Sequence, residues 1–81
     1  MSWRVFATAA SESDFERLSE QDRAALNDDL FAWVDSGPPR RNHRLVLDLE
    51  VFEDVVPSGF RVTYIVNEEV PYVAVLRVRK L

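Results

Sequence analysis

The chain has 81 residues, 47% of them hydrophobic, and its formal net charge of −4 argues against a protein that coats nucleic acid nonspecifically. This length suits one small domain over residues 1–81, and the lack of cysteine excludes disulfides and thiolate metal sites. No apolar run is long enough to span a membrane and the N-terminus has no signal-peptide layout, so we expect a soluble cytoplasmic protein.

The first half of the chain predicts a strand followed by two helices. Residues 3–8 are rich in β formers and predict the strand. Two S-x-x-D patterns follow, at 11–14 and 19–22, and this pattern is typical of a helix N-cap. They predict a short helix at about 12–18 and a longer helix at about 20–35.

The longer helix has an apolar stripe and a clear end. The stripe consists of residues three, four or seven apart, which share one face of a helix: Leu26, Leu30, Trp33 and Val34. Gly37 can adopt the left-handed conformation that closes a helix, and the two prolines after it cannot continue one.

The second half predicts strands. After a basic loop at 40–44, apolar residues alternate from Leu45 to Val51, which predicts a strand, and a second extended piece runs on to Val56. Two more strands and the turn between them follow, at 60–66, 67–70 and 72–79. We therefore predict an α+β domain in which a helical hairpin packs on a mostly antiparallel sheet of about four strands, in the order β-α-α-β-β-β.

Four cations lie on the last predicted hairpin: Arg61, Arg77, Arg79 and Lys80. Antiparallel pairing brings them to one end of the sheet. A two-residue loop pairs Arg61 with Leu76, whereas a loop one residue longer pairs it with Arg77, and the sequence leaves this register open. Two interpretations of the cluster stay open: ion pairs with Glu50, Glu53 or Asp54, or a phosphate site formed by guanidinium groups.

A family resemblance adds to this pattern. The stretch S-G-F-R-V-T-Y-I-V at 58–66, the acidic turn N-E-E-V, and a valine-rich last strand that closes on R-V-R-K resemble the RelE/ParE superfamily of toxins from toxin–antitoxin systems. The pair Phe52-Glu53 is also similar to an aromatic-Glu pair of that family. The resemblance covers nearly the whole chain and implies a single RelE/ParE-like toxin domain.

The resemblance implies a toxin that a cognate antitoxin protein holds inactive. Its implied activity is translation inhibition through ribosome-dependent cleavage of messenger RNA, as an endoribonuclease without metal or cofactor. The implied catalytic cations are Arg61, which matches the family's strand arginine, and Arg79 and Lys80, which match the basic end of the last strand. Alternatives are a ParE-like inhibitor of DNA gyrase without catalysis and an inactive toxin-like scaffold that binds a protein partner, since Phe52 and Asp54 stand where RelE-type nucleases carry lysines.

Other residues complete the list of candidates. Further RNA- or phosphate-binding cations are expected at Arg40, Arg41, Arg44 and Arg77. His43 is the only histidine and is a candidate general base, although a lone histidine in a loop is more often solvated. One histidine without cysteine argues against zinc, and two glycines are too few for a nucleotide-binding loop, so no cofactor is expected.

Overall fold

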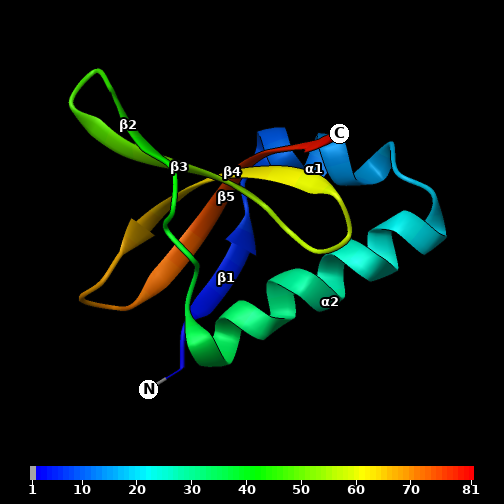
Figure 1. Ribbon diagram of the computed structural model, residues 1–81, viewed down its shortest axis with the longest axis horizontal. Coiled ribbons are helices and arrows are strands. Elements are labelled where there is room, and N and C mark those ends of the chain that lie inside the picture. Colours follow the sequence, from blue (N-terminus) through cyan, green and yellow to red (C-terminus); the bar gives the residue numbers. More distant parts are fainter. Residues whose placement is uncertain (1) are drawn as a thin grey trace.

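A five-stranded mixed sheet carries the fold (Figure 1). The computed structural model describes residues 2–81, and its elements in chain order are β1 (Arg4–Ala7), α1 (Ala9–Glu16), α2 (Glu20–Ser36), β2 (His43–Val46), β3 (Leu49–Val55), β4 (Phe60–Asn67) and β5 (Tyr72–Lys80). The strand order is β1-β5-β4-β3-β2, with β1 parallel to β5 and the other pairs antiparallel. This confirms the predicted α+β class, with one strand more than the expected four.

The helices begin where hydroxyl side chains cap them. Ser19 accepts a hydrogen bond from the Asp22 N–H at 3.1 Å, so the predicted start of α2 is confirmed. The predicted start of α1 is wrong, because its N-cap is Thr8 and Ser11 is the third helical residue of the capping box. Thr8 ends β1 and also donates from its hydroxyl to the Val75 carbonyl at 2.9 Å, so one residue closes the strand and opens the helix.

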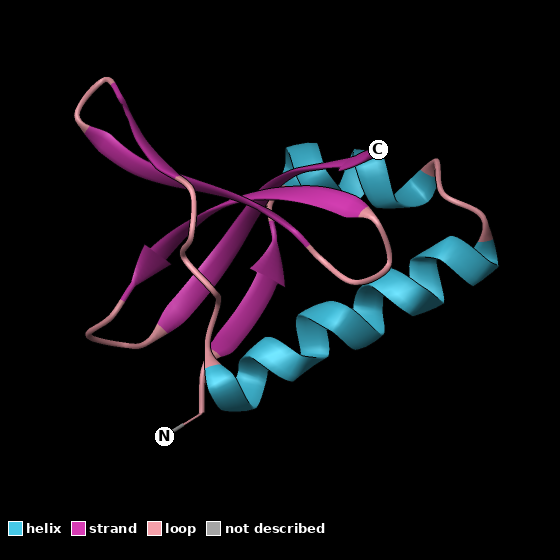
Figure 2. Cartoon of the chain, in the orientation of Figure 1, coloured by secondary structure: helices cyan, strands magenta, loops and turns pink. Residues whose placement is uncertain are grey.

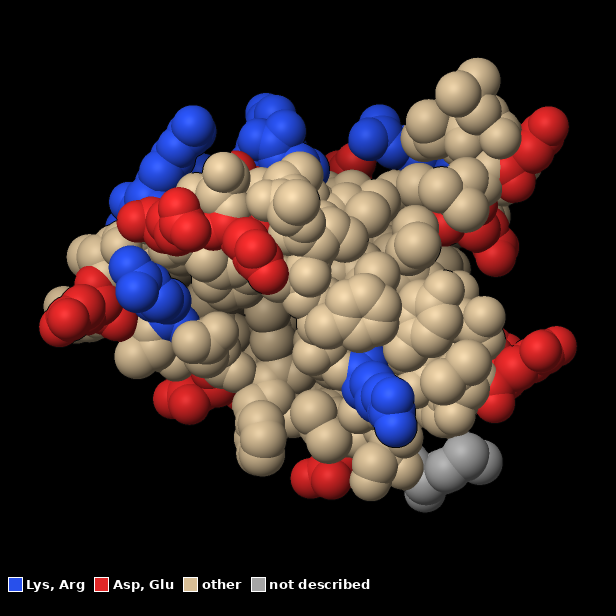
Figure 3. Space-filling model, turned by 180° about the vertical axis from the view of Figure 1, so that it is seen from behind, with Lys and Arg blue, Asp and Glu red and all other residues tan. Residues whose placement is uncertain are grey.

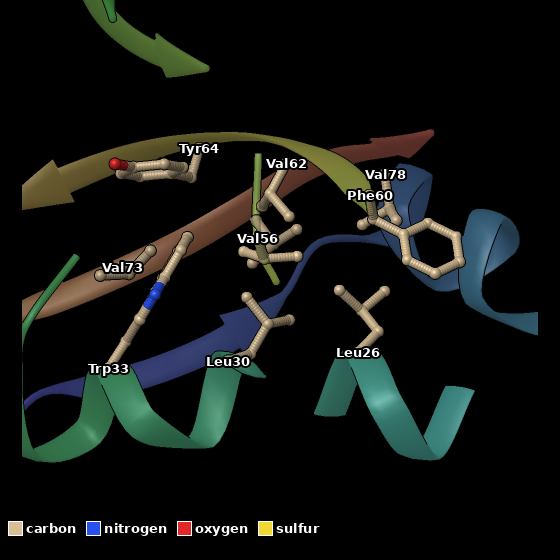
Figure 4. Close-up of a cluster of buried hydrophobic side chains, with 10 residues drawn as sticks. Leu26, Leu30, Trp33, Val56, Phe60, Val62, Tyr64, Val73 and Val78 are labelled. Carbon is tan, nitrogen blue, oxygen red and sulfur yellow. The ribbon is translucent and has the colours of Figure 1, made fainter. Parts of the chain in front are cut away.

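The core lies between α2 and the two central strands. Leu26, Leu30 and Trp33 project from α2 onto the sheet, where Phe60, Val62 and Tyr64 of β4 and the valines of β5 meet them (Figure 4). These side chains are between 0% and 6% exposed. Burying one such large apolar side chain contributes about 1.5–3 kcal/mol, so this layer fixes α2 on the sheet.

Gly37 is required at the end of α2 for two independent reasons. Its φ of +77° is a conformation that side chains other than glycine rarely adopt. A Cβ at this position would also lie 2.8 Å from the Trp3 indole nitrogen. The predicted helix end is confirmed, and the close approach of Trp3 explains why the chain must turn so tightly here.

A tight hairpin joins β2 to β3, and it corrects the prediction of one strand from Leu45 to Val51. The chain reverses at Leu47 and Asp48, whose φ angles are +49° and +67°, and Val46 then pairs with Leu49. Two successive positive φ angles are the geometry of a type I′ hairpin turn. Alternation of apolar residues continues through this turn in the sequence, which is why the pattern suggested a single strand.

The segment between α2 and β2 is held by a buried hydrogen-bond network. Asp54 is 2% exposed, and its carboxylate accepts from the Tyr64 hydroxyl at 2.5 Å and from the Arg41 N–H at 3.3 Å. The Tyr64 hydroxyl in turn accepts from the Arg40 N–H at 2.9 Å. Burial raises the pKa of Tyr64 well above its usual value, and the neighbouring Asp54 adds to this shift, so the hydroxyl stays protonated as a donor.

Figure 2 shows the resulting arrangement: the two helices lie apart from the β2–β3 hairpin, which projects beyond the rest of the sheet. No helix within residues 2–81 is both long and apolar enough to cross a membrane. The β4–β5 pair forms the middle of the sheet, and its register decides how the cations of the last hairpin are arranged.

Candidate anion-binding site

The β4–β5 register places Arg61 directly opposite Arg79. Neither pairing considered from the sequence is correct, because Asn67 pairs with Tyr72 and the connection is longer than a tight turn. A bulge also leaves Leu76 without a partner, since Thr63 pairs with Arg77 and Tyr64 with Val75. The β4–β5 register and the bulge at Leu76 both depend on how the strands pack in the folded sheet, and no local sequence signal indicates them.

Arg61 and Arg79 form an exposed pair of like charges on the sheet face that turns away from the core, called here the arginine face. Opposed residues of an antiparallel pair point to the same face with Cβ atoms about 4.5–5.5 Å apart. Neither guanidinium makes an ion pair or hydrogen bond with a described residue. Figure 3 shows several basic side chains along one edge of the molecule. Two adjacent unpaired cations repel each other, and a bound anion would relieve that repulsion.

The other two cations of the hairpin are already paired. The Arg77 guanidinium donates to both oxygens of Asp14, at 3.0 Å from Nε and 3.3 Å from Nη2. Lys80 lies opposite Phe60, on the face toward the helices, and its Nζ is 3.0 Å from Asp22 in the first turn of α2. The structure therefore brings Arg61 and Arg79 together and separates Lys80 from them.

Asp14 is a buried carboxylate that ties α1 to β5. Besides the Arg77 guanidinium it accepts the Val78 N–H at 2.9 Å, and it is only 9% exposed. The hydrogen bond from Arg77 lowers the pKa of Asp14 below its usual value, and the Val78 N–H acts in the same direction against the effect of burial. In return, Asp14 raises the pKa of Arg77, which remains a cation throughout.

The three carboxylates that the sequence offered as neutralisers have other partners. Glu50 lies 3.0 Å from His43, Glu53 lies 2.5 Å from Arg44, and Asp54 binds the Tyr64 hydroxyl. None of them pairs with Arg61 or Arg79 in the described part of the chain. The interpretation of the cluster as internal ion pairs thus holds for Arg77 and Lys80, whose partners come from the helices instead.

The basic stretch after α2 is divided among several contacts, and of its side chains only that of Arg44 reaches a residue on the face of Arg61, namely Glu53, in the described part of the chain. Arg40 pairs with Glu68, and its guanidinium lies 5.5 Å from the centre of the Trp3 ring. Arg41 contributes its backbone N–H to Asp54, and Arg44 pairs with Glu53. His43 pairs with Phe52, which faces the core side with Tyr64, so the histidine lies on the face opposite Arg61.

Glu53 is a functional candidate to which the sequence analysis gave no catalytic role, naming it as a neutraliser and as part of the aromatic-Glu pair. It pairs with Thr63 on β4, and Val55 pairs with Arg61, so Glu53 shares the arginine face and is a diagonal neighbour of Arg61. Its side chain is 28% exposed. Arg61 and Thr63 point to the same face because they are two residues apart on β4, and Glu53 lies opposite Thr63. This assignment requires the β3–β4 register, which the sequence does not give.

A second surface feature is an apolar groove of about 520 Å³ between β1 and the two helices. Its apolar walls come from three elements: Val5, Phe6, Phe15, Leu30, Phe31 and Val34. Arg23 also lines it, and the buried Nε of Arg23 has no hydrogen-bond partner among residues 2–81. Phe31 is 70% exposed. Within residues 2–81 no cluster of His, Asp or Glu side chains is arranged to hold a metal ion.

Comparison with solved structures shows which fold this is. The chain superposes on a chain of the intact Escherichia coli RelBE toxin–antitoxin complex with a TM-score of 0.74 at 21% identity, covering 99% of this chain and 98% of that one. A chain of the RelBE2 toxin–antitoxin complex from Mycobacterium tuberculosis gives 0.73 at 20% identity, with full coverage of both. A chain of the archaeal RelE–RelB complex from Pyrococcus horikoshii gives 0.74 at 16% identity, covering 99% and 96%. The chain thus has the RelE fold.

No family model matches the sequence, and no curated protein matches it. The likeness therefore lies in the fold and is not accompanied by close sequence similarity.

The lowered pKa of Asp14 predicts a specific loss of stability in acid. Its folded pKa lies below the ordinary value of 3.8, so the stabilisation is fully present above about pH 3.8 and is lost as the pH falls through the folded pKa. We expect Asp14→Asn to lower the free energy of unfolding at pH 7 and to flatten its decline below pH 4, measured by urea unfolding across pH. Asp28→Asn is the control, because this exposed carboxyl makes no ion pair or side-chain hydrogen bond within residues 2–81, and it should change stability by less than about 0.5 kcal/mol. An acid profile of Asp14→Asn that parallels the wild type would contradict this assignment.

Proposed function

We propose that this chain, which has the fold of the RelE toxins, is the toxin of a toxin–antitoxin pair and cleaves messenger RNA on the ribosome. The unpaired arginines of the arginine face are the single observation that supports this proposal most strongly. A protein with net charge −4 neutralises most cations near this site with its own carboxylates, but it leaves these two available for an outside anion.

The chemistry that suits such a site is attack of a ribose 2′-OH on the adjacent phosphate. The 2′ oxygen forms a new bond to phosphorus while the bond to the 5′ oxygen of the next nucleotide breaks, and this leaving oxygen takes a proton from water, which gives a 2′,3′-cyclic phosphate and a 5′-hydroxyl. Negative charge builds on the phosphate oxygens during this step, and fixed cations at that place stabilise the transition state. Guanidinium groups bind phosphate oxygens in two-point fashion, so Arg61 and Arg79 would hold the scissile phosphate between them.

The attack also needs a base to accept the proton of the 2′-OH. Glu53 is the carboxylate that shares the arginine face with Arg61, through the β3–β4 register. In its ion pair with Arg44, the arginine side chain is 65% exposed and the Glu53 side chain 28% exposed. Solvent-accessible ion pairs are weak, so Arg44 can move to the RNA backbone when a message binds. Lys80 has no part in this step because it lies on the other face of the sheet.

The antitoxin is the partner that this proposal requires. The similar chains from Mycobacterium tuberculosis and Escherichia coli come from the RelBE2 and RelBE toxin–antitoxin complexes. The apolar groove beside β1 is a suitable surface for a partner segment, because it exposes Phe31 and contains the unsatisfied Nε of Arg23. An apolar segment with one acidic side chain would fill the groove and give that Nε an acceptor.

Removal of either guanidinium from the arginine face should abolish toxicity. We expect Arg61→Ala and Arg79→Ala each to slow message cleavage about 10²–10³-fold, which is the usual loss for one donor at a developing oxyanion. The measurement is growth after induced expression, together with mapping of cut sites in messages. Arg17→Ala removes an exposed arginine at the C-cap of α1 and is the matched control, with full toxicity expected. Full toxicity of Arg61→Ala, or a DNA-damage response without cut messages, would contradict the nuclease and favour gyrase inhibition.

Replacement of the proposed base should slow cleavage without weakening binding of the message. We expect Glu53→Gln to lower the single-turnover rate about 10²–10⁴-fold, the usual contribution of general acid–base catalysis. Glu50→Gln, on the opposite face, is the control and should cleave at the wild-type rate. Equal rates for Glu53→Gln and wild type would remove Glu53 from the mechanism.

Damage to the groove should release the toxin from its antitoxin and leave cleavage intact. Phe31→Asp places a charge where an apolar side chain of the partner is expected, and loss of such an anchor costs about 2 kcal/mol or more, which is roughly 30-fold in affinity. The measurement is rescue from growth arrest by the co-expressed product of the adjacent open reading frame. Val70→Asp, at an exposed apolar residue outside the groove, should be rescued normally. Rescue of Phe31→Asp as complete as that of the wild type would place the antitoxin elsewhere.

A further inference from the structure

The β2–β3 hairpin presents an unusual concentration of exposed apolar side chains. Leu47 is 98% exposed, Leu45 65%, Leu49 51% and Val46 44%. The hairpin projects beyond the sheet at the upper left of Figure 1, and no other element covers it. Nothing in the proposed RNA cleavage uses these residues, which lie away from the arginine face or at the tip of the hairpin.

The tip carries a residue that is unfavourable there for two reasons. Leu47 has a φ of +49°, and a left-handed conformation costs a residue with a side chain about 1–2 kcal/mol. Turns of this type normally use Asn or Gly at such positions. Leu47 also gains no packing within its own chain, since it is almost fully exposed. A strained, exposed leucine is what a turn carries when the compensating contact comes from another molecule.

The edge of the sheet beside this tip is open. Among the described strands β2 pairs with β3 alone, and the hydrogen bond from the Glu53 N–H to the Asn42 carbonyl fixes which peptide groups of β2 point toward β3. Backbone groups alternate in direction along a strand. The peptide groups of Leu45 and His43 therefore point outward, away from β3, where they can pair with a further strand.

The usual protection of an open edge is missing here. Charged side chains on an edge strand discourage pairing with another chain. On β2 the charged side chains are engaged within the hairpin, because Arg44 pairs with Glu53 and His43 Nε2 lies 3.0 Å from Glu50. A second copy of this edge is a matching partner, because it offers the same outward peptide groups of His43 and Leu45 and the same exposed leucines.

We propose that two copies of this chain associate through their β2 strands, antiparallel and with Leu45 opposite Leu45 of the second copy. A two-fold axis perpendicular to the sheet passes between one residue and its own copy in the second chain. The two middle residues of β2, Arg44 and Leu45, are the positions at which the axis leaves most of the strand paired. Centring at Arg44 sets two arginines directly opposite each other and is disfavoured. Centring at Leu45 uses its outward N–H and carbonyl and carries Leu47 toward His43 of the second copy.

The association would join two five-stranded sheets into one, with both arginine faces on the same side. It does not rest on the proposed nuclease function, because it follows from the edge and tip of the hairpin alone. The partner is a second copy of this chain and not a strand of another protein, which makes the oligomeric state of the pure protein decisive.

Two measurements on the purified full chain test the association. We expect sedimentation equilibrium to show a monomer–dimer equilibrium, and Leu45→Lys to weaken it at least tenfold. Leu81→Lys changes a residue of equal exposure, 67% against 65%, and should dimerise like the wild type. The chain has no cysteine, so Leu45→Cys supplies a single thiol. Its Cα would lie about 5.5 Å from its mate, which suits a disulfide, so mild oxidation should give a covalent dimer where Leu81→Cys does not.

The opposite results would overturn the inference. These are a wild type that stays monomeric at every concentration, Leu45→Lys that dimerises as well as Leu81→Lys, or Leu45→Cys that cross-links no faster than Leu81→Cys. Circular dichroism of each variant confirms that loss of association is not loss of fold, which is expected because Leu45 is two-thirds exposed.

Discussion

The carboxylate of Asp14 is the constraint on which the arrangement of this molecule depends most. It accepts from the Val78 N–H and from the Arg77 guanidinium, and so it fixes α1 beside β5 just past the bulge at Leu76. With Arg77 bound there, one cation of the last hairpin is neutralised. Asp22 neutralises a second by pairing with Lys80 on the other face of the sheet. What remains is an opposed pair of arginines that has no ion-pair partner among residues 2–81, in an otherwise acidic protein.

This distribution of charge argues for a ligand more strongly than the number of cations does. Four cations on one hairpin could have been neutralised by the neighbouring strand, and the helices do neutralise two of them. The acids of β3 are engaged elsewhere, with Asp54 buried against Tyr64 and Glu53 held by Arg44 at an exposed site. Buried pairs of this kind are structural, whereas exposed pairs exchange partners at little cost. The RelE fold gives this anion site its proposed context.

Much of the fold could be predicted from local signals, and most of the exceptions depend on contacts between residues that are far apart in the sequence. The cap at Ser19, the glycine at the end of α2 and the last two strands are local features, and the structure confirms them. The cap of α1 was misplaced because Thr8 is fixed by Val75, far away in the sequence. The hairpin at Leu47 was missed because no turn-forming pair marks it. The pairing of Arg61 with Arg79 depends on a bulge, and a bulge is decided by packing on both faces of the sheet. The acid partners of Arg77 and Lys80, which come from the helices, were invisible for the same reason.

The most direct test of the account is the chemistry of the cut end. Purified chain should be incubated with programmed ribosomes and a defined message, and the 3′ ends of the fragments analysed. A site built from two guanidiniums and a carboxylate predicts a 2′,3′-cyclic phosphate, and a message with a 2′-deoxy nucleotide at the cut site should stay intact. Cleavage that proceeds through the 2′-deoxy position, or a wild-type chain that cuts no message, would contradict the central claim.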